Sequence, residues 1–550
     1  MTLTRREVLK GITAAAVSTY LSSASYGVPT SPPLPRMPLE EFVQDQTLVS
    51  ALRKGVKGMK ARKPSDPLSW FYQAAIHGVT PEAVKKAAVE DPKVEAVFKK
   101  RYWNQCPHDG ENSANFLPWH RGYTYYFERI LRMHTEDGRF SLPYWNYTEK
   151  ANRKFPREFG IKHLDGNIGN DDPANINPLY LAERDFYFTG YEHPFATGLP
   201  LLELSDSAVD ISLPMNTRVF FGETEREGLA GGIADEDPST RGLLESYPHD
   251  QIHRAVGGII DSSTGESSVG AMATPPTAAF DPIFPIHHAN IDRLWAEWSC
   301  MAGKSWGKLP SDSWFEERPW FFFDTDSNVI NEPRRKYFDY RALGIRFKYE
   351  NLKCKPLALP SRTVAMVHTE AVVEEQLQQV ELLKTVQKQV ALLPAGRSFI
   401  PLMPLMQDHL TTVLSMSKSQ AETIPQPREI KRVLLTLQQV RLGTIESTGF
   451  DLHLTSDSSR SLSRNDPSFI GSISLFRHSE GMQHDSAHNG IGMDETFDIT
   501  NALAFHNASS ADHLGILAVP YPLLTTAGGR PPEASRQLLL MDGFSLSLVK

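Results

Sequence analysis

The spacing of apolar residues along the chain changes from a helical period to an alternating one. In residues 281–298 apolar and aromatic side chains recur every three or four positions, which predicts a helix with one buried face. Beyond about residue 428 the period becomes two, as where Phe450, Leu452 and Leu454 alternate with polar residues, and such alternation predicts half-buried strands. We therefore expect a mainly α front domain and a C-terminal all-β sandwich.

Between these two domains lies a segment with a pattern of its own. Residues 372–393, "VVEEQLQQVELLKTVQKQVALL", have apolar positions at helical spacing and predict one amphipathic helix, whose apolar stripe would cover the core or pair with another chain. Prolines then interrupt the chain as far as Pro427. We therefore predict a front domain over 29–355, a helical and proline-broken linker over 356–427, and a β-domain over 428–550.

The first 28 residues have the pattern of an export leader. Arg5 and Arg6 precede an Ala-rich apolar run that is too short to span a membrane, and small residues suited to cleavage follow it. This order predicts a twin-arginine signal peptide over 1–28 and a periplasmic or secreted protein with no membrane anchor after cleavage. The alternative is an N-terminal helix with two surface arginines.

Composition narrows the class of partner. The chain has 550 residues and a formal net charge of -8, which argues against nucleic acid because phosphate binding requires a basic face. Its three cysteines can form at most one disulfide, so the fold does not depend on a disulfide framework. The chemistry must therefore be sought in particular side chains.

Histidines supply the strongest chemical signal. In "HDQIHRAVGG" two of them stand one helical turn apart, and others occur in "FYQAAIHG", "CPHDGENSANFLPWHRG" and "DPIFPIHHANIDRLW". Sets of imidazoles without thiolate or carboxylate ligands favour copper. Taken singly, each is as well explained as a surface or core histidine, and the pair lacks the glutamate of a zinc-protease helix. The clustered residues are His77, His108, His120, His249, His253, His287 and His288.

Three longer motifs extend this signal to a family. "FLPWHRGYTYYFERIL", "PHDQIHRAVGG" and "DPIFPIHHANIDRLW" resemble the signature motifs of the type 3 copper proteins, which comprise tyrosinases, catechol oxidases and molluscan haemocyanins. The resemblance implies a four-helix bundle around two copper ions, with dioxygen as co-substrate and three histidines on each ion. The first ion would take His77, His108 and His120, and the second His249, His253 and His288.

The resemblance also implies roles for residues beside the ligands. Cys106 would form a thioether to His108; otherwise it is a plain buried cysteine. Glu245 and Asp250 would hold a water that accepts the proton of a phenol. Family members that hydroxylate monophenols often have asparagine in place of Asp250, and two carboxylates would couple so that one stays protonated. Asp250 is otherwise an ordinary acid in the first turn of a helix.

Three further positions concern substrate access. His287 would be a neighbour of the copper at the cavity wall. Arg254 would steer a substrate carboxylate, or else is a solvated helix residue. Pro275 aligns with a bulky phenylalanine of plant catechol oxidases, so a smaller residue there predicts an open cavity that admits monophenols.

The C-terminal region resembles the shielding domain of haemocyanins and pro-tyrosinases, through "GSISLFRHSEGMQHDSAHNGIGMDETFDIT". In those proteins a hydrophobic side chain blocks the copper pair. Phe476 is the candidate plug and Met482 the second choice; Phe476 is otherwise a core strand residue. The chain would then be latent until a protease cuts within 356–427, a long, proline-broken connection.

These inferences predict a latent, exported tyrosinase that converts small monophenols to o-diphenols and o-diphenols to o-quinones. The alternatives are a catechol oxidase or o-aminophenol oxidase without monophenolase activity, a haemocyanin-like oxygen carrier, and a copper-storage module. The expected partners are phenolic substrates and an activating protease, and a homo-oligomer stays open.

Overall fold

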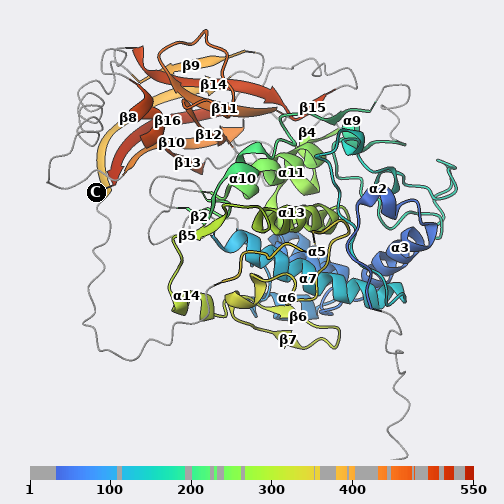
Figure 1. The fold of residues 1–550 in the computed structure, drawn as a ribbon. Helices are drawn as coiled ribbons and strands as arrows, with labels where there is room; N and C mark the ends of the chain where they lie inside the picture. Colours follow the sequence, from blue (N-terminus) through green and yellow to red (C-terminus); the bar gives the residue numbers. More distant parts are fainter. Residues whose placement is uncertain are drawn as a thin grey trace, which may run out of the picture.

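The computed structural model describes fifteen stretches of the chain: residues 32–107, 114–192, 201–222, 228–231, 241–261, 267–351, 353–359, 380–392, 396–402, 432–442, 448–473, 476, 493–506, 513–525 and 539–549. The predicted leader, His108 and Met482 lie outside them. Figure 1 shows a helical body, blue to yellow, below a β-rich domain, orange to red. The predicted fold class is therefore confirmed.

The helical body is built around a few long helices. α3 (Gln46–Lys60) starts at Asp45, whose side chain accepts hydrogen bonds from the backbone N–H groups of Thr47 and Leu48. It packs along α7, and Gly55 permits the approach because a Cβ there would meet Leu131 Cδ1 at 2.8 Å. The longer helices are α3, α4 (Trp70–His77), α5 (Pro81–Glu90), α7 (Phe116–Thr135), α11 (Asp250–Gly257) and α13 (Phe284–Ser299).

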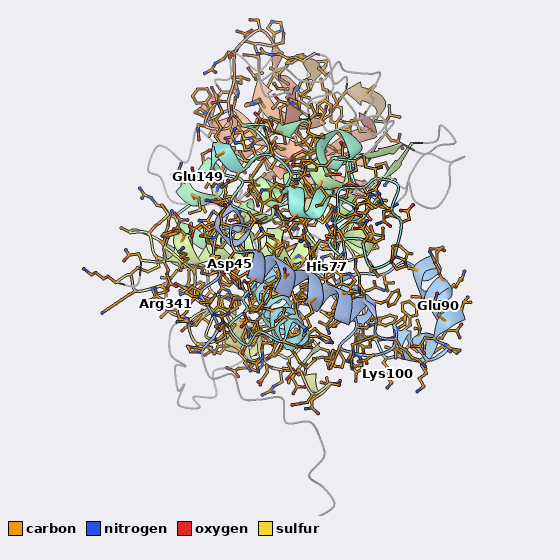
Figure 2. The ribbon with its side chains drawn as sticks, turned by 90° about the vertical axis from the view of Figure 1, so that its right-hand side faces the viewer. Asp45, His77, Glu90, Lys100, Glu149 and Arg341 are labelled. Atoms are coloured by element: carbon orange, nitrogen blue, oxygen red, sulfur yellow. A yellow bond between two sulfur atoms is a disulfide. The ribbon has the colours of Figure 1, made fainter. Side chains whose placement is uncertain are left out.

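Shorter elements complete this body. Short helices are α2 (Leu39–Phe42), α6 (Lys93–Phe98), α8 (Arg157–Gly160), α9 (Phe186–Thr189), α10 (Ser212–Asn216), α12 (Pro275–Ala278), α14 (Asp312–Glu316), η2 (Lys150–Asn152), η4 (Glu245–His249), η5 (Ala271–Ala273) and η6 (Arg334–Tyr337). Short strands are β2 (Val219–Phe221), β3 (Ile259–Asp261), β4 (Ser267–Val269), β5 (Ser305–Gly307), β6 (Phe322–Phe323) and β7 (Val329–Ile330). Figure 2 shows side chains filling the interior around His77, while the exposed Glu90 and Lys100 lie at the edge.

A buried charge network fixes the register of α7 against α13. Asp292 on α13 accepts hydrogen bonds from Arg121 Nε at 2.6 Å and from Arg36 Nη1 at 2.9 Å. Arg36 Nε also donates to Glu128 of α7 at 2.7 Å. Buried charges tolerate such a position only when they are paired in this way. Because Arg121 follows His120 and Asp292 stands one turn after His288, the network also sets the spacing between two candidate ligands.

The β-domain is a sandwich of two four-stranded antiparallel sheets, with strand orders β13-β10-β16-β8 and β12-β11-β14-β9. The alternation predicted around Phe450, Leu452 and Leu454 is confirmed, since all three are buried in the core that the sheets share. The strands are β8 (Val380–Leu392), β9 (Ser398–Pro401), β10 (Arg432–Leu442), β11 (Thr448–Thr455), β12 (Phe469–Ile473), β13 (Met493–Asp498), β14 (Gly515–Pro522) and β16 (Leu539–Val549), with helix α17 (Thr500–Phe505) beside them.

The helix predicted over 372–393 is wrong for its described part, because residues 380–392 form strand β8. β8 pairs with β16 from Val380 opposite Val549 to Leu392 opposite Leu539. Its valines suit a strand, and pairing with residues about 160 positions away overrides the local helical spacing. Strands β8 and β9 thus belong to the sandwich although they fall within the range predicted as linker.

Direct pairing joins the two domains. β1 (Glu203–Leu204) of the helical body pairs antiparallel with β15 (Leu524–Thr525), and Ser205 Oγ donates to the carbonyl of Pro522 at 2.6 Å. The cysteines form one bridge, Cys300–Cys354, as their number allows. Within the described residues no helix has the length and apolar character needed to cross a membrane.

Candidate metal centre

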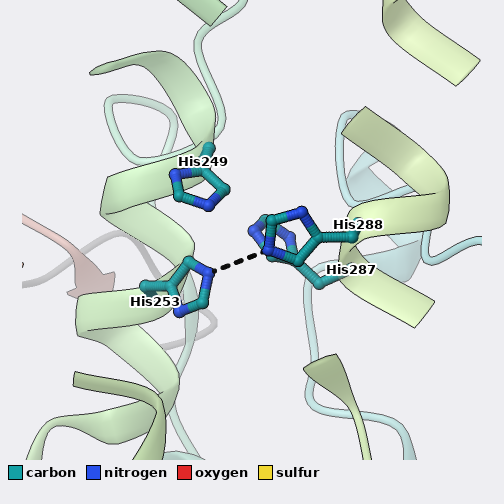
Figure 3. Close-up of side chains that lie close together, drawn as sticks. All are labelled: His249, His253, His287 and His288. Carbon is teal, nitrogen blue, oxygen red and sulfur yellow. Dashed lines mark hydrogen bonds between the residues drawn. The ribbon is translucent and has the colours of Figure 1, made fainter. Parts of the chain in front are cut away.

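Helices α4, α7, α11 and α13 bring the described histidines of the motifs together in the interior. The rings of His120 and His288 stack at 4.2 Å between centroids, and His249 lies 4.9 Å from His288. The potential ligand atoms fall into two groups, each with all its atoms within 4.8 Å of one another: His77, Cys106 and His120, and His249, His253, His287 and His288. Figure 3 shows the second group between α11 and α13.

Backbone carbonyls orient three of these rings. The Nδ1 atoms of His77, His120 and His253 lie 3.0, 2.8 and 2.9 Å from the carbonyl oxygens of Pro275, Phe116 and Met272. Since a carbonyl only accepts, each Nδ1 carries the hydrogen and each Nε2 keeps its lone pair for a metal. Gly78 serves this arrangement, because a Cβ there would lie 2.7 Å from the Pro275 oxygen.

The spacing inside the second group fits one shared ion. His253 Nε2 and His288 Nε2 lie 3.4 Å apart (Figure 3). Two nitrogens held tetrahedrally at about 2.0–2.1 Å from one ion are separated by about 3.3 Å. Burial lowers the pKa of His77 to about 3 and holds the pKa values of His120, His253 and His288 well below the ordinary value, so these rings are neutral, as ligands must be.

His249 is oriented by a carboxylate instead of a carbonyl. Its Nδ1 donates to Asp250 Oδ1 at 2.8 Å, and the other oxygen, Oδ2, lies 2.8 Å from Arg241 Nη2. The same Nη2 donates to Glu245 Oε1 at 2.8 Å. Sequence reasoning missed Arg241, although its position four residues before Glu245 was the available signal. The expected pair of coupled carboxylates therefore has a cation between them.

Phe476 lies directly on the second group. Its ring stacks on that of His253 at 4.2 Å with 30° between the planes, and it meets His249 edge-on at 5.8 Å. It is fully buried and packs with the core of the helical body, not with the core of the sandwich. The alternative that Phe476 is a core strand residue of the β-domain is therefore wrong. Its role as a plug stays a prediction.

Two other predicted site residues, His287 and Cys106, lie within the described part of the chain. His287 is buried, with Nδ1 3.3 Å from the hydroxyl of Tyr147, and it stacks on His249 at 5.3 Å. Cys106 Sγ lies 3.3 Å from His120 Nε2. Because His108 lies outside the described residues, its place as a ligand and the predicted thioether stay predictions.

Arg254 and Pro275 are both buried. Arg254 is 1 % exposed; burial lowers its pKa to about 10, and Asp185 is the carboxylate that opposes the shift. The alternative of a solvated helix residue is therefore wrong for Arg254, and steering of a substrate stays a prediction. Pro275 uses its carbonyl to hold His77, and its part in cavity width is likewise a prediction.

A second arginine, which sequence reasoning also missed, links the domains beside the centre. The guanidinium of Arg464 lies 4.7 Å from the ring of Tyr247 and 4.6 Å from the ring of Tyr521. Its Nε lies 3.0 Å from Asp451 Oδ2. The hydroxyl of Tyr521 donates to Gln251, one residue beyond Asp250, at 3.1 Å. The β-domain is thus fastened next to the histidine helix.

Comparisons with known proteins agree with this centre. Residues 67–301 match the common central domain of tyrosinase, and residues 380–526 match a domain of unknown function. A tyrosinase of Hahella sp. (strain CCB-MM4) is 34% identical over 284 residues, which cover 48% of this chain and 53% of the relative. Polyphenol oxidase A1 of Vicia faba is 26% identical over 62% of this chain and 52% of the relative. The chain thus spans about half the length of these curated relatives.

Solved structures also align over nearly the whole chain. One of them, the latent tyrosinase of apple, covers 96% of this chain and 99% of its own, at 17% identity and a TM-score of 0.49. The buried imidazole centre lies within the matched tyrosinase domain. The part of the chain over residues 67–301 matches the tyrosinase family model, and the curated relatives named above are a tyrosinase and a polyphenol oxidase. The matched domain and the all-imidazole second group support copper as the metal of the centre.

Proposed function

We propose that this protein is a latent, exported tyrosinase that uses two copper ions and dioxygen. It would hydroxylate monophenols to o-diphenols and oxidise o-diphenols to o-quinones. Each dioxygen that is reduced to two waters would oxidise two o-diphenols. One observation carries the proposal: buried histidines from four helices form two groups beside an aromatic side chain. When bound, copper supplies electron exchange with dioxygen and a Lewis acid for the phenolic oxygen.

The protein's own residues would position the substrate and exclude water. The ring of Phe476 stacks on the His253 imidazole, and that place suits the ring of a phenol equally well. An aromatic substrate would therefore compete with Phe476 for one position. The ring of Phe284 lies 4.2 Å from that of His288 between centroids and adds apolar surface beside the metal centre. His287 would form part of the cavity wall.

Latency follows from the seat of Phe476, because substrate enters only when that ring leaves. The protease that activates the chain would have to remove the β-domain. Since β8 and β9 belong to the sandwich, the cut that frees the whole domain falls before Val380. The twin-arginine leader over 1–28 would carry the folded protein out of the cytoplasm, so periplasmic or secreted placement is part of the proposal.

A second candidate is a catechol oxidase or o-aminophenol oxidase without monophenolase activity. A phenol has a pKa near 10 and must lose its proton before it binds a metal at neutral pH. Glu245 and Asp250 were expected to accept that proton through a water. Both carboxylates bind Arg241, and Asp250 also holds His249, so fewer oxygens remain for a water. This arrangement favours oxidation of substrates that are already o-diphenols.

The test loads the full chain with copper and cuts part of it before Val380. Oxygen uptake is then measured on tyrosine methyl ester and on catechol. Turnover of both substrates by the cut protein alone supports the latent tyrosinase. Turnover of catechol alone replaces it by the second candidate. A cut, two-copper protein that oxidises neither substrate refutes both.

A further inference from the structure

Arg241 occupies a buried position between two acidic residues of the metal centre. One nitrogen, Nη2, lies 2.8 Å from Glu245 Oε1 and 2.8 Å from Asp250 Oδ2. The exposed fractions of the side chains are 12% for Arg241, 2% for Glu245 and 1% for Asp250. Charge pairs this deep are strong only while every member keeps its geometry.

Asp250 connects Arg241 to a candidate metal ligand, His249. Asp250 Oδ1 accepts the Nδ1 hydrogen of His249, so the orientation of the His249 ring depends on where Arg241 holds the other oxygen, Oδ2. The other described ligand histidines whose Nδ1 is fixed use backbone carbonyls, which cannot move independently of the chain. The orientation of His249 therefore depends on the side chain of Asp250, which Arg241 in turn binds.

Arg241 also meets the β-domain. It lines a small cavity between the domains together with Tyr247, Phe497 and Glu495, a buried residue of β13. Burial opposes the charge of Arg241, but Asp250, Glu245 and Glu495 together raise its pKa above the ordinary value. Within the described residues, its Nε and Nη1 atoms are buried and make no hydrogen bond. Glu495, across this cavity, is thus one of three acidic residues whose charges stabilise the charged form of the guanidinium.

We propose that Arg241 is a positioning residue for the copper ligand His249, and that the β-domain contributes to this positioning through Glu495. Docking of the β-domain would then affect the metal centre itself, in addition to covering it. The proposal rests on the proposed function only in that copper binds at these histidines.

The experiment measures copper affinity by competition with a chelator, in the full chain, without any turnover. Arg241→Met keeps the bulk of the side chain and removes its charge and donors; the expected result is copper binding weakened about tenfold or more, the usual effect of losing a partner of a ligand histidine. Arg241→Lys restores the charge and should recover part of the affinity. Glu495→Gln should weaken binding less than Arg241→Met.

Asp494→Asn is the matched control for Glu495→Gln. It removes the same charge one residue away on β13, from an exposed side chain that binds Gln439, and copper affinity should not change. The melting temperature of each copper-free variant separates loss of fold from loss of positioning. If Arg241→Met does not fold, Arg241→Lys and Glu495→Gln carry the test.

The outcomes separate the inference from the proposed function. Wild-type protein that binds no copper refutes the proposed function. If the wild-type protein binds copper and the variants bind it equally well, the inference is overturned and the proposed function stands. The same holds if Asp494→Asn loses as much copper affinity as the other variants do. A graded loss from Glu495→Gln to Arg241→Met, with Asp494→Asn unchanged, supports it.

Discussion

Phe476 of the β-domain and His253 of the metal centre stack ring on ring at 4.2 Å, although they are 223 positions apart in sequence. Most buried apolar residues of the sandwich lie in its own core, but Phe476, Tyr521, Leu523 and Leu524 pack with the core of the helical body. The contact of Phe476 joins the two domains at the place where a substrate would act.

Replacing Phe476 with alanine should open the centre of the uncut chain. Catechol oxidation by the full-length, copper-loaded variant should rise from near zero towards the rate of the cut wild type, while unfolding stability falls by about 3–5 kcal/mol. Oxygen uptake checks the first effect and urea denaturation the second. Phe505→Ala, at a half-exposed phenylalanine of the same domain, is the control. If the uncut Phe476→Ala variant is inactive and becomes active only after cutting, Phe476 is not the plug.

Arg464 should slow the release of the β-domain after the chain is cut. Arg464→Met removes the cation paired with Asp451 and the contacts with Tyr247 and Tyr521, so the β-domain should leave the cut variant sooner than it leaves the cut wild type. Size-exclusion chromatography after cutting before Val380 gives the answer. Arg460→Met is the matched control because Arg460 is 43% exposed and, among the described residues, forms its ion pair with Asp466 of the same domain. Equal elution of all three cut proteins would disprove the role.

The disulfide should stabilise the helical body without acting on the metal. Cys300 and Cys354 are 54 positions apart, and closing a loop of that length contributes about 4 kcal/mol by the chain-entropy estimate. The double variant Cys300→Ser, Cys354→Ser should therefore unfold at lower urea concentration with unchanged copper content. Wild type treated with a reductant is the control and should shift equally. A loss of copper in the folded variant would show that the bridge shapes the centre.

Acid should weaken the sandwich through His453. Burial lowers its pKa to about 4 from an ordinary 6.5, so the folded state keeps the ring neutral while the unfolded chain takes up a proton. The stability it contributes is complete above about pH 6.5 and is lost as pH falls towards 4, by up to about 3 kcal/mol. Denaturation of the copper-free protein between pH 7 and 4 measures this loss. His453→Gln should flatten that part of the profile, and an unchanged profile would assign it to other groups.

The parts of this protein that sequence could predict are those whose signal is local. The histidine pair one turn apart predicts the helix that contains α11, and the alternation around Leu452 predicts strand β11. Neither signal depends on residues distant in sequence. The candidate ligands followed from such motifs, and all of those within the described residues lie in one centre.

The failures share a physical cause, which is contact between distant segments. β8 has helical spacing but becomes a strand because β16 provides a partner. Arg464 meets Tyr247, 217 positions away in sequence, only in the folded chain. Arg241 is the exception, because its partner Glu245 stands only four positions later. The pattern of a single sequence contains no information about such contacts between distant segments.

The pairing of β8 with β16 has a consequence for how activation is recognised. The first and last described strands of the sandwich lie side by side, so each sheet combines strands from before and after the interval between Leu402 and Arg432. A break in that interval would yield two bands on a denaturing gel, yet the pieces would remain one particle in solution with Phe476 still seated. The size of the fragments on a denaturing gel therefore does not show whether the enzyme is active. Activation is shown by the separation of the cut protein into two particles in solution.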